Sequence, residues 1–293
     1  MTQGDARYAV PALTRGLQLL MQFSAEEREL TGAELARRLN APRASIFRLL
    51  HTLEQLGFVE RVGDASSYRL GLAVLRLGYA YLASIELNEH ARPVLDALAA
   101  ATGYSSHLVV RDGRDVVFVA KTAGRQALFH SIQVGARLPA HATVLGRILL
   151  GGLGTAALTA LFGPGPLKTF TPQTPASIKK LKVLIDHDRA QGYGISQGGF
   201  ESGISVIAAP VQDENGKVSA AISITVPAQQ IDAARAAPLI AHVRAAAAQL
   251  SGRVRHMTVQ TVRTPETSRT LQTPQAARPP RNPAALSLQR QAA

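Results

Sequence analysis

Four arginines gather in a short stretch of the sequence with no acidic residue between them. They are Arg37, Arg38, Arg43 and Arg48. Guanidinium groups suit phosphate oxygens and base edges, because they present several hydrogen-bond donors in a planar fork. Acidic residues nearly balance the charge over residues 31–70 as a whole, so the positive excess is local. Such a patch predicts an anionic partner, with nucleic acid the first class to consider.

Residues suited to catalysis are present, but their spacing is poor. Ser105, Ser106 and His107 are adjacent, and neighbouring residues of a strand face opposite sides, which separates nucleophile from base. The sequence has no His-Glu-x-x-His or P-loop motif, its eight histidines are scattered, and it has no cysteine. We therefore expect no catalysis, no cofactor and no metal; a hydrolase remains the alternative, which turnover of a bound ligand would reveal.

The arginine cluster spans two predicted helices separated by a sharp break. Thr31 is a suitable N-cap for the first, and Glu34 completes a capping box. Pro42 ends that helix and suits the first turn of the next. Gly57 then ends the second helix, because glycine readily adopts the left-handed backbone conformation that closes a helix. The apolar stripe of the second helix follows the 3.6-residue period and consists of Ile46, Leu49, Leu50, Leu53 and Leu56.

A hairpin follows, with strands near residues 58–61 and 68–70 around a turn at residues 63–67. Two helices and a hairpin in this order predict a winged helix-turn-helix, whose second helix enters the major groove of DNA. A helical protein-interaction domain with a solvated basic face is the alternative. The residues that we assign to DNA contact are Thr31, Arg43, Ala44, Ser45, Arg48, His51 and Arg69.

The length of 293 residues favours two domains, and a composition with 46% hydrophobic and 18% charged residues is that of a globular protein. The net charge of +12 again favours an anionic partner. No apolar run is long enough to span a bilayer and no secretory signal is visible, so we expect no membrane association and a cytoplasmic location. We divide the chain into residues 1–70 (winged domain), 71–87 (linker), 88–255 (second domain) and 256–293 (disordered tail).

Two helices outside the helix-turn-helix carry apolar stripes. The first starts at Pro11, and its Leu13, Leu17, Leu20 and Met21 are expected to cover the winged domain. The linker repeats apolar residues in steps of three and four, the spacing of a short coiled coil, which favours a homodimer. Packing on the winged domain is the alternative for this stripe, formed by Leu72, Leu75, Tyr79 and Leu82.

The second half mixes helices and antiparallel hairpins, which makes the chain an α+β protein. Asn88 caps a helix through Ala101, and another helix starts around residues 141–143, where its N–H groups can bind an anion. The remaining elements are expected as hairpins at 107–120 and 204–226, a strand at 128–134, and helices at 158–162, 175–191 and 231–254.

Three segments together resemble the IclR family of bacterial transcriptional regulators. They are the run from Leu35 to Leu50, residues 135–143 with Gly146 and Arg147, and residues 203–211 before a glycine-turn hairpin. The resemblance covers about residues 11–254. It implies an N-terminal winged helix, a linker helix, and a C-terminal effector domain with a curved antiparallel sheet similar to GAF and PAS domains. It also implies dimers or tetramers. Within the family, residues 131–143 look most like the Pca and Pob members, which respond to aromatic acids or their ring-cleavage products.

The resemblance also implies an effector pocket for a small organic or aromatic acid. Carried over position by position, its residues are His130, Leu138, Val144, Leu145, Ile204, Val206, Ser223 and Thr225. Some members place acidic residues where this chain has the uncharged segment 196–200, which leaves the identity of the ligand open. The sequence thus predicts a ligand-responsive regulator of a catabolic operon that binds double-stranded operator DNA.

Overall fold

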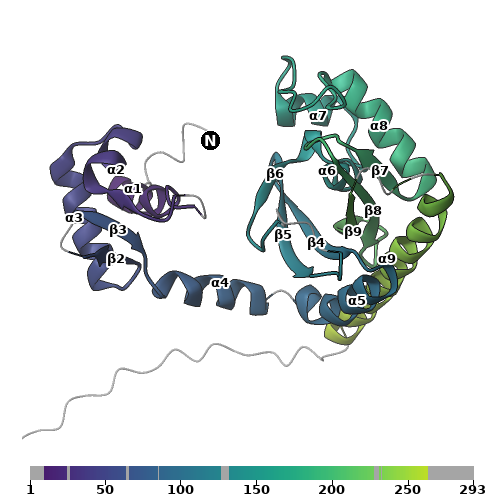
Figure 1. Ribbon diagram of the computed structural model, residues 1–293, viewed down its shortest axis with the longest axis horizontal. Helices are drawn as coiled ribbons and strands as arrows, with labels where there is room; N and C mark the ends of the chain where they lie inside the picture. Colours follow the sequence, from purple (N-terminus) through teal and green to yellow (C-terminus); the bar gives the residue numbers. More distant parts are fainter. Residues whose placement is uncertain are drawn as a thin grey trace, which may run out of the picture.

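The computed structural model describes residues 10–24, 27–63, 66–84, 86–126, 132–227, 231 and 233–262. Figure 1 shows a small helical domain and a larger domain built on a sheet, joined by the helix α4 (Ala73–Ser84). This arrangement confirms the predicted α+β fold, with an N-terminal winged helix-turn-helix, a linker helix and a C-terminal antiparallel sheet.

The small domain contains three helices and a three-stranded sheet in the order β1-β3-β2. Its core centres on Leu35, Ile46, Leu50 and Tyr68. The elements are α1 (Pro11–Leu20), β1 (Leu30–Thr31), α2 (Gly32–Arg38), α3 (Arg43–Gln55), β2 (Val59–Val62) and β3 (Ser67–Leu70).

Local interactions fix the ends of α2 and α3 as the sequence predicts. The Glu34 backbone N–H donates to Thr31 Oγ1 at 3.2 Å, while the Thr31 backbone N–H donates to Glu34 Oε2 at 2.8 Å, which completes the capping box. Asn40 adopts a positive φ of 47° in the turn, a conformation that asparagine tolerates better than most residues. Gly57 ends α3 with a φ of 73°.

Some apolar residues that were predicted to face the core from α1 and α3 are exposed instead. On α1 the buried side is formed by Gly16 and Leu19, whereas Leu13, Leu17 and Met21 are 62%, 49% and 77% exposed. The helix carries apolar residues on more than one side, and only one of them faces the winged core. Leu56 is also exposed, because it caps α3 beyond the last turn that packs on the core.

The helix α4 is followed by α5 (Glu86–Thr102), which begins two residues before Asn88. Asn88 is therefore inside the helix and is not its cap. Pro93 also lies within α5. Leu72, Leu75, Leu77 and Tyr79 are all at least 60% exposed, so the alternative that the linker stripe packs on the winged domain is wrong for these side chains.

The larger domain is built on a six-stranded antiparallel sheet in the order β6-β5-β4-β9-β8-β7. Its two central strands, β4 and β9, come from opposite ends of the domain sequence. The strands are β4 (Ser105–Asp112), β5 (Asp115–Thr122), β6 (Arg137–Pro139), β7 (Gly194–Gln197), β8 (Ile204–Gln212) and β9 (Val218–Pro227).

Helices cover both faces of this sheet. One face packs on α5 and α9 (Ala233–Val262), and alternate residues of β9 such as Ile222 and Ile224 point toward them. The other face packs on α6 (Val144–Leu149), α7 (Thr155–Phe162) and α8 (Ile178–Gln191), which follow the short 3-10 helix η2 (Ala140–Ala142).

The sequence patterns did not predict β7, and the strand predicted at residues 128–134 is not found at its described residues. The described residues 132–136 of the strand expected at 128–134 are turn and coil, and the edge strand β6 begins at Arg137. The helix α9 runs to Val262, so residues 256–262 of the expected tail are helical. The rest of that expected tail lies outside the described residues.

Candidate functional site

The first candidate site is the exposed side of α3. Arg43, Ala44, Arg48 and His51 are exposed, and Ser45 is half-buried in the first turn. They lie opposite the stripe around Ile46 and Leu50 that α3 buries in the core. The first turn of α3 is therefore free to approach a groove, and within the described part of the chain Arg43 and Arg48 form no ion pair.

Two other members of the predicted DNA-contact set, Arg69 and Thr31, already form hydrogen bonds within the domain, as does Arg38 of the arginine cluster. The Arg69 guanidinium donates to Glu60 Oε2 at 3.0 Å across the wing hairpin. Arg38 donates to both carboxylate oxygens of Glu27, at 2.8 and 2.7 Å. Thr31 Oγ1 donates to Glu34 at 2.8 Å. Glu27, which lies upstream of the arginine cluster, thus neutralises part of its charge. Fewer arginines of the cluster are unpaired than the sequence suggests.

The second candidate site is a cavity between the sheet and the start of α6. Its volume is about 70 Å³, well below the roughly 300 Å³ at which small-molecule sites begin. A ligand larger than a few waters must therefore displace part of the wall. The lining residues come from six strands, the start of α6 and two connecting loops: Ser105, His107, Phe118, Ile132, Leu138, Thr143, Val144, Leu145, Ser196, Gly199, Phe200, Glu201, Ile204, Val206 and Thr225.

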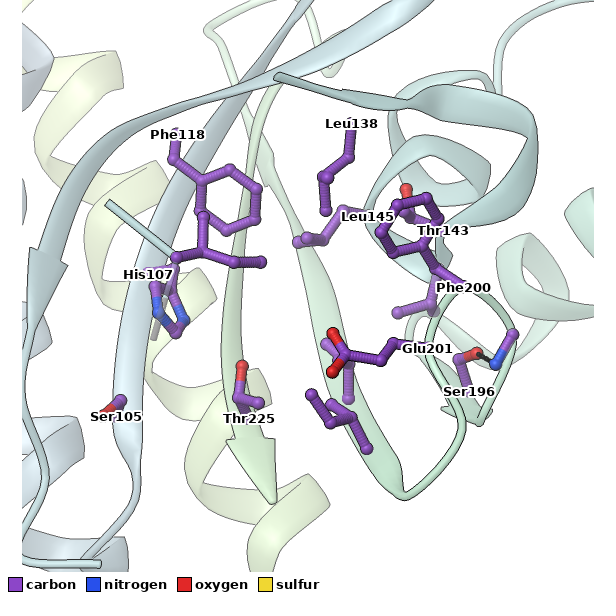
Figure 2. Close-up of a pocket in the computed structure, with 15 residues that line it drawn as sticks. Ser105, His107, Phe118, Leu138, Thr143, Leu145, Ser196, Phe200, Glu201 and Thr225 are labelled. Atoms are coloured by element: carbon purple, nitrogen blue, oxygen red, sulfur yellow. Dashed lines mark hydrogen bonds between the residues drawn. The ribbon is translucent and has the colours of Figure 1, made fainter. Parts of the chain in front are cut away.

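Alternation along the strands determines which side chains reach this cavity. Ser105 and His107 on β4 lie on the same face of the sheet as Thr225 on β9, and β4 pairs with β9. In Figure 2 the apolar side chains of Phe118, Leu138 and Leu145 lie between two polar groups. His107 and Thr225 form one group, toward which the Glu201 carboxylate projects, and Thr143 and Ser196 form the other. The cavity thus has two polar ends and an apolar waist.

His107 is the unusual polar residue of the cavity. It is only 3% exposed, and the edge of its ring meets Phe118 at a centroid distance of 5.5 Å. Burial, together with the positive charge of Lys121, lowers the pKa of His107 to about 4. The imidazole is therefore neutral at neutral pH. Its Nδ1 and the Oγ of its cross-strand neighbour Ser223 are buried without a hydrogen-bond partner within the described residues.

The wall opposite β4 and β9 is a loop that carries Phe200 and Glu201. Gly198 and Gly203 border it at positive φ, 73° and 86°. Thr171 Oγ1 donates to the Gly198 carbonyl at 2.7 Å, and Thr174 Oγ1 donates to the Gly199 carbonyl at 2.7 Å. The loop is therefore anchored at its start, and the Gly198 N–H donates to the Ile204 carbonyl at 2.8 Å across its base.

A buried ion pair supports the helix that lines the cavity. Arg147 Nε on α6 lies 2.6 Å from Asp188 Oδ2 on α8, and Arg147 Nη2 donates to the Ile195 carbonyl at 2.9 Å. Burial raises the pKa of Asp188, against the opposing effect of Arg147. Gly146 allows α6 to approach η2, because a Cβ there would lie 1.9 Å from the Ala140 carbonyl oxygen.

Most residues that the resemblance assigned to an effector pocket line this cavity. They are Leu138, Val144, Leu145, Ile204, Val206 and Thr225. Ser223 lies on the same face of β9 but is fully buried and does not line the cavity. His130 lies outside the described residues.

Sequence reasoning missed His107, Ser105, Phe118 and Glu201 as lining residues. His107 and Ser105 alternate on a strand that was predicted, but the pairing of that strand with β9 was not. Glu201 follows directly after the segment identified as uncharged, so the acidic group of the cavity lies one residue beyond it.

In the described part of the chain, no group of three or more histidine, cysteine, aspartate or glutamate residues is arranged to hold a metal ion. No helix among the described residues has the length and apolar character to cross a membrane.

Two family models match the chain. The model described as the IclR helix-turn-helix domain matches residues 12–63, and the model for the C-terminal domain of bacterial IclR transcriptional regulators matches residues 79–252. These limits include the exposed side of α3 in one match and the whole cavity in the other.

Characterised relatives agree with the family models. The chain is 32% identical over 228 residues to the HTH-type transcriptional regulator XynR of Escherichia coli (strain K12), which covers 78% of this chain and 90% of that protein. It is 34% identical over 223 residues to the Pca regulon regulatory protein of Pseudomonas putida, covering 76% of each. Both are named as regulators, not as enzymes.

Solved structures show the same architecture. A transcriptional regulator from Rhodococcus sp. RHA1 is 33% identical, with a TM-score of 0.74 over 86% of this chain and all of that one. An IclR homolog from Microbacterium hydrocarbonoxydans, solved as a complex with 4-hydroxybenzoate, is 25% identical, with a TM-score of 0.73 over 84% of this chain and 99% of that one. With both of its domains matched, this chain belongs to the IclR family of bacterial transcriptional regulators.

Proposed function

We propose that this regulator controls a catabolic operon and responds to a small organic or aromatic acid bound in the cavity of the larger domain. The observation that carries the proposal is the combination, in one chain, of an unpaired cationic helix face and a separate two-ended cavity, joined by a single helix. We assign residues 1–70 to DNA binding, 71–87 to the linker and 88–255 to effector binding. Residues 256–293 are then an accessory tail.

The exposed side of α3 is proposed to contact operator DNA. Arg48 and Arg43 would reach base edges and phosphates, and Ala44, Ser45 and His51 complete the face that enters the groove. Arg69, paired with Glu60, and Thr31, occupied in the capping box, would contribute at the margin of the interface. Because Arg69 and Thr31 already form these contacts within the domain, we expect their substitution to weaken DNA binding less than substitution of Arg43 or Arg48.

The cavity is proposed to bind the effector through Leu138, Val144, Leu145, Ile204, Val206 and Thr225, with Ser223 behind the wall and His130 as the remaining family position. An apolar waist between polar ends suits a small molecule with a hydrocarbon centre and polar groups at its two ends. The 4-hydroxybenzoate complex of the Microbacterium homolog and the name of the Pca relative support an aromatic acid or a product of its breakdown.

The regulator is proposed to act as a homodimer through α4 and the outer side of α1. α4 has 12 residues, and isolated helices of that length are marginal in water. Its large apolar side chains are nevertheless exposed, with Tyr79 at 73% and Leu75 at 69%. A second copy of the chain would cover them and would set the spacing of two recognition helices to two operator half-sites.

Effector binding and operator binding would then be coupled. If the effector binds one dimer arrangement better than another, it shifts the distance between the recognition helices, and the coupling acts equally in both directions. α4 would transmit such a shift, because it bridges the two domains in the described part of the chain (Figure 1).

A thermal-shift screen of aromatic and aliphatic acids tests the proposal, since a ligand that binds only the folded state raises apparent stability. The stabilising acid is then added to a gel-shift titration of promoter DNA at fixed salt. The expected result is a change in operator affinity without turnover of the acid. Equal retention of promoter and random fragments, with or without the acid, would falsify the proposal.

A further inference from the structure

We propose that the end of the cavity formed by His107, Thr225 and Glu201 receives a hydroxyl group of the effector, and that Glu201 excludes a second carboxylate from this end. The inference rests on the proposed function, because it concerns the effector of the same cavity. It names a ligand class within it: hydroxylated monocarboxylic acids and not dicarboxylic acids.

The charged groups of the cavity wall favour a neutral ligand group at this end. Among the described lining residues, Glu201 is the one with an acidic side chain, and neither lysine nor arginine lines the cavity. An anionic group placed at this end would face the Glu201 carboxylate, which is itself exposed, with no counterion in the wall. Lys121, opposite His107 on β5, is the nearby cation, but it is not a lining residue.

Polar side chains converge at this end of the cavity. Figure 2 shows the Glu201 carboxylate projecting from its loop toward the side of the cavity that carries Thr225 and His107. An ionised carboxylate only accepts hydrogen bonds, whereas threonine hydroxyls and neutral imidazoles both donate and accept. A ligand hydroxyl can donate to Glu201 and accept from Thr225 or His107. A ligand carboxylate can accept only, and it leaves Glu201 without a donor.

Two polar atoms behind this end of the cavity lack hydrogen-bond partners among the described residues. His107 Nδ1 and Ser223 Oγ are buried, lie on paired residues of β4 and β9, and have no partner in the described part of the chain. Buried polar atoms without partners are rare and are costly to maintain. They are explained if a bound hydroxyl reorients the His107 ring and the Ser223 hydroxyl into one hydrogen-bonded chain.

A cationic group fits this end less well than a hydroxyl. An ammonium would satisfy Glu201, but it would also be placed against His107, where burial already disfavours positive charge. The other two polar side chains that define this end, His107 and Thr225, are neutral. A neutral group with both donor and acceptor capacity matches them.

The test compares ligands that differ only at this end, by isothermal titration calorimetry on the full-length chain at neutral pH. The aromatic set is 4-hydroxybenzoate, benzoate and terephthalate, and the aliphatic set is 6-hydroxyhexanoate, hexanoate and adipate. In at least one set we expect the hydroxylated acid to bind about tenfold more tightly than the unsubstituted acid, the effect of one hydrogen bond. The dicarboxylate should bind more weakly than both.

Glu201→Gln removes the charge and keeps the shape of the side chain. We expect the preference for the hydroxylated acid over the dicarboxylate to fall by about tenfold or more, mainly because the dicarboxylate gains affinity. Glu214→Gln, at the exposed β8–β9 turn, is the matched control and should leave the preference unchanged. Lys121→Met should also leave it unchanged, which shows that this lysine is not the partner of a ligand carboxylate.

The proposal is overturned if the dicarboxylate binds the native chain as tightly as the hydroxylated acid, if Glu201→Gln leaves the preference unchanged, or if no hydroxylated acid binds. These outcomes are distinct from failure of the proposed function. Hydroxylated acids that bind as expected but leave operator binding unchanged refute effector control and support the ligand class. A dicarboxylate that binds most tightly and changes operator binding would refute the ligand class and support effector control.

Discussion

Two arginine–carboxylate pairs of nearly equal length occupy opposite environments in the two domains. In the winged domain, Arg38 Nη2 lies 2.7 Å from Glu27 Oε1, with side-chain exposures of 27% and 54%. In the larger domain, Arg147 Nε lies 2.6 Å from Asp188 Oδ2, with exposures of 7% and 5%. The hydrogen bond from Arg38 lowers the pKa of Glu27, whereas burial raises the pKa of Asp188.

This difference extends to the candidate sites. Among the described residues of the winged domain no charged side chain is buried, and the proposed functional charges of this domain lie in water. The larger domain buries polar groups such as His107, Ser223 and Asp188 around the cavity. A surface that binds a polyanion can rely on charge in solvent, but a cavity that selects one small molecule needs desolvated polar groups whose hydrogen bonds discriminate.

The largest expected effect separates the two ion pairs. Arg147→Met leaves Asp188 charged and buried without its partner, and breaking a buried pair in this way costs on the order of 3–5 kcal/mol. Urea unfolding followed by circular dichroism measures the loss. Arg38→Met is the matched control and should change stability little, because its pair is solvated. Equal losses in the two variants would contradict the contrast between the domains.

The next effect is a pH dependence specific to the larger domain. The pKa of His107 is lowered to about 4 from 6.5, so the unfolded chain binds more protons at this residue between these pH values. The contribution is fully present above pH 6.5 and is lost as the pH falls, up to about 3 kcal/mol near pH 4. Unfolding titrations from pH 7 to pH 4 measure it.

His107→Gln keeps a polar side chain but cannot titrate. We expect this variant to lose the part of the pH dependence that lies between pH 6.5 and 4. The exposed His51 on α3 serves for comparison, and His51→Gln should retain the dependence of the native chain. An unchanged profile in His107→Gln would show that other groups cause the acid sensitivity.

A smaller effect tests the solvated charges of the winged domain. Arg48→Ala should weaken specific operator binding by about 1–3 kcal/mol, or roughly tenfold to more than a hundredfold. Gel-shift titrations at fixed salt measure this change, and calorimetry should show unchanged effector binding. Arg92→Ala, which removes an exposed arginine from α5, controls for net charge. Equal weakening by both variants would argue against a specific role for α3.

The smallest effect concerns the capping box. Thr31→Ala removes the acceptor for the Glu34 backbone N–H and should destabilise the winged domain by about 1 kcal/mol. Thr31→Ser keeps the hydroxyl and should restore most of that loss. Thermal unfolding of both variants measures the difference. If Ala and Ser at this position behaved alike, the cap would contribute nothing to the position of α2.

Local patterns were sufficient to predict the winged domain. The capping box at Thr31, the break at Pro42 and the turn at Gly57 each act within a few residues, so the sequence shows them directly. The apolar stripe of α1 was misassigned, because Leu13 and Leu17 satisfy helical periodicity without indicating which side meets the core. Periodicity identifies amphipathic sides but does not rank two of them.

The cavity was only partly predictable, because its wall depends on strand pairing. Leu138 and Val206 were carried over from the family resemblance. His107 reaches the cavity because β4 pairs with β9, a contact between residues about a hundred positions apart that no local pattern reveals. Glu201 depends on a loop held by Thr171 and Thr174. Such tertiary hydrogen bonds have no sequence periodicity.

The central pairing of β4 with β9 also determines the order in which the chain can fold during synthesis. The winged domain closes on contacts within residues 10–72, whereas the six-stranded sheet is incomplete until β9 has left the ribosome. At typical translation rates, that interval is on the order of ten seconds or more. The residues that form the core of the winged domain are therefore all synthesised before the larger domain can complete its sheet.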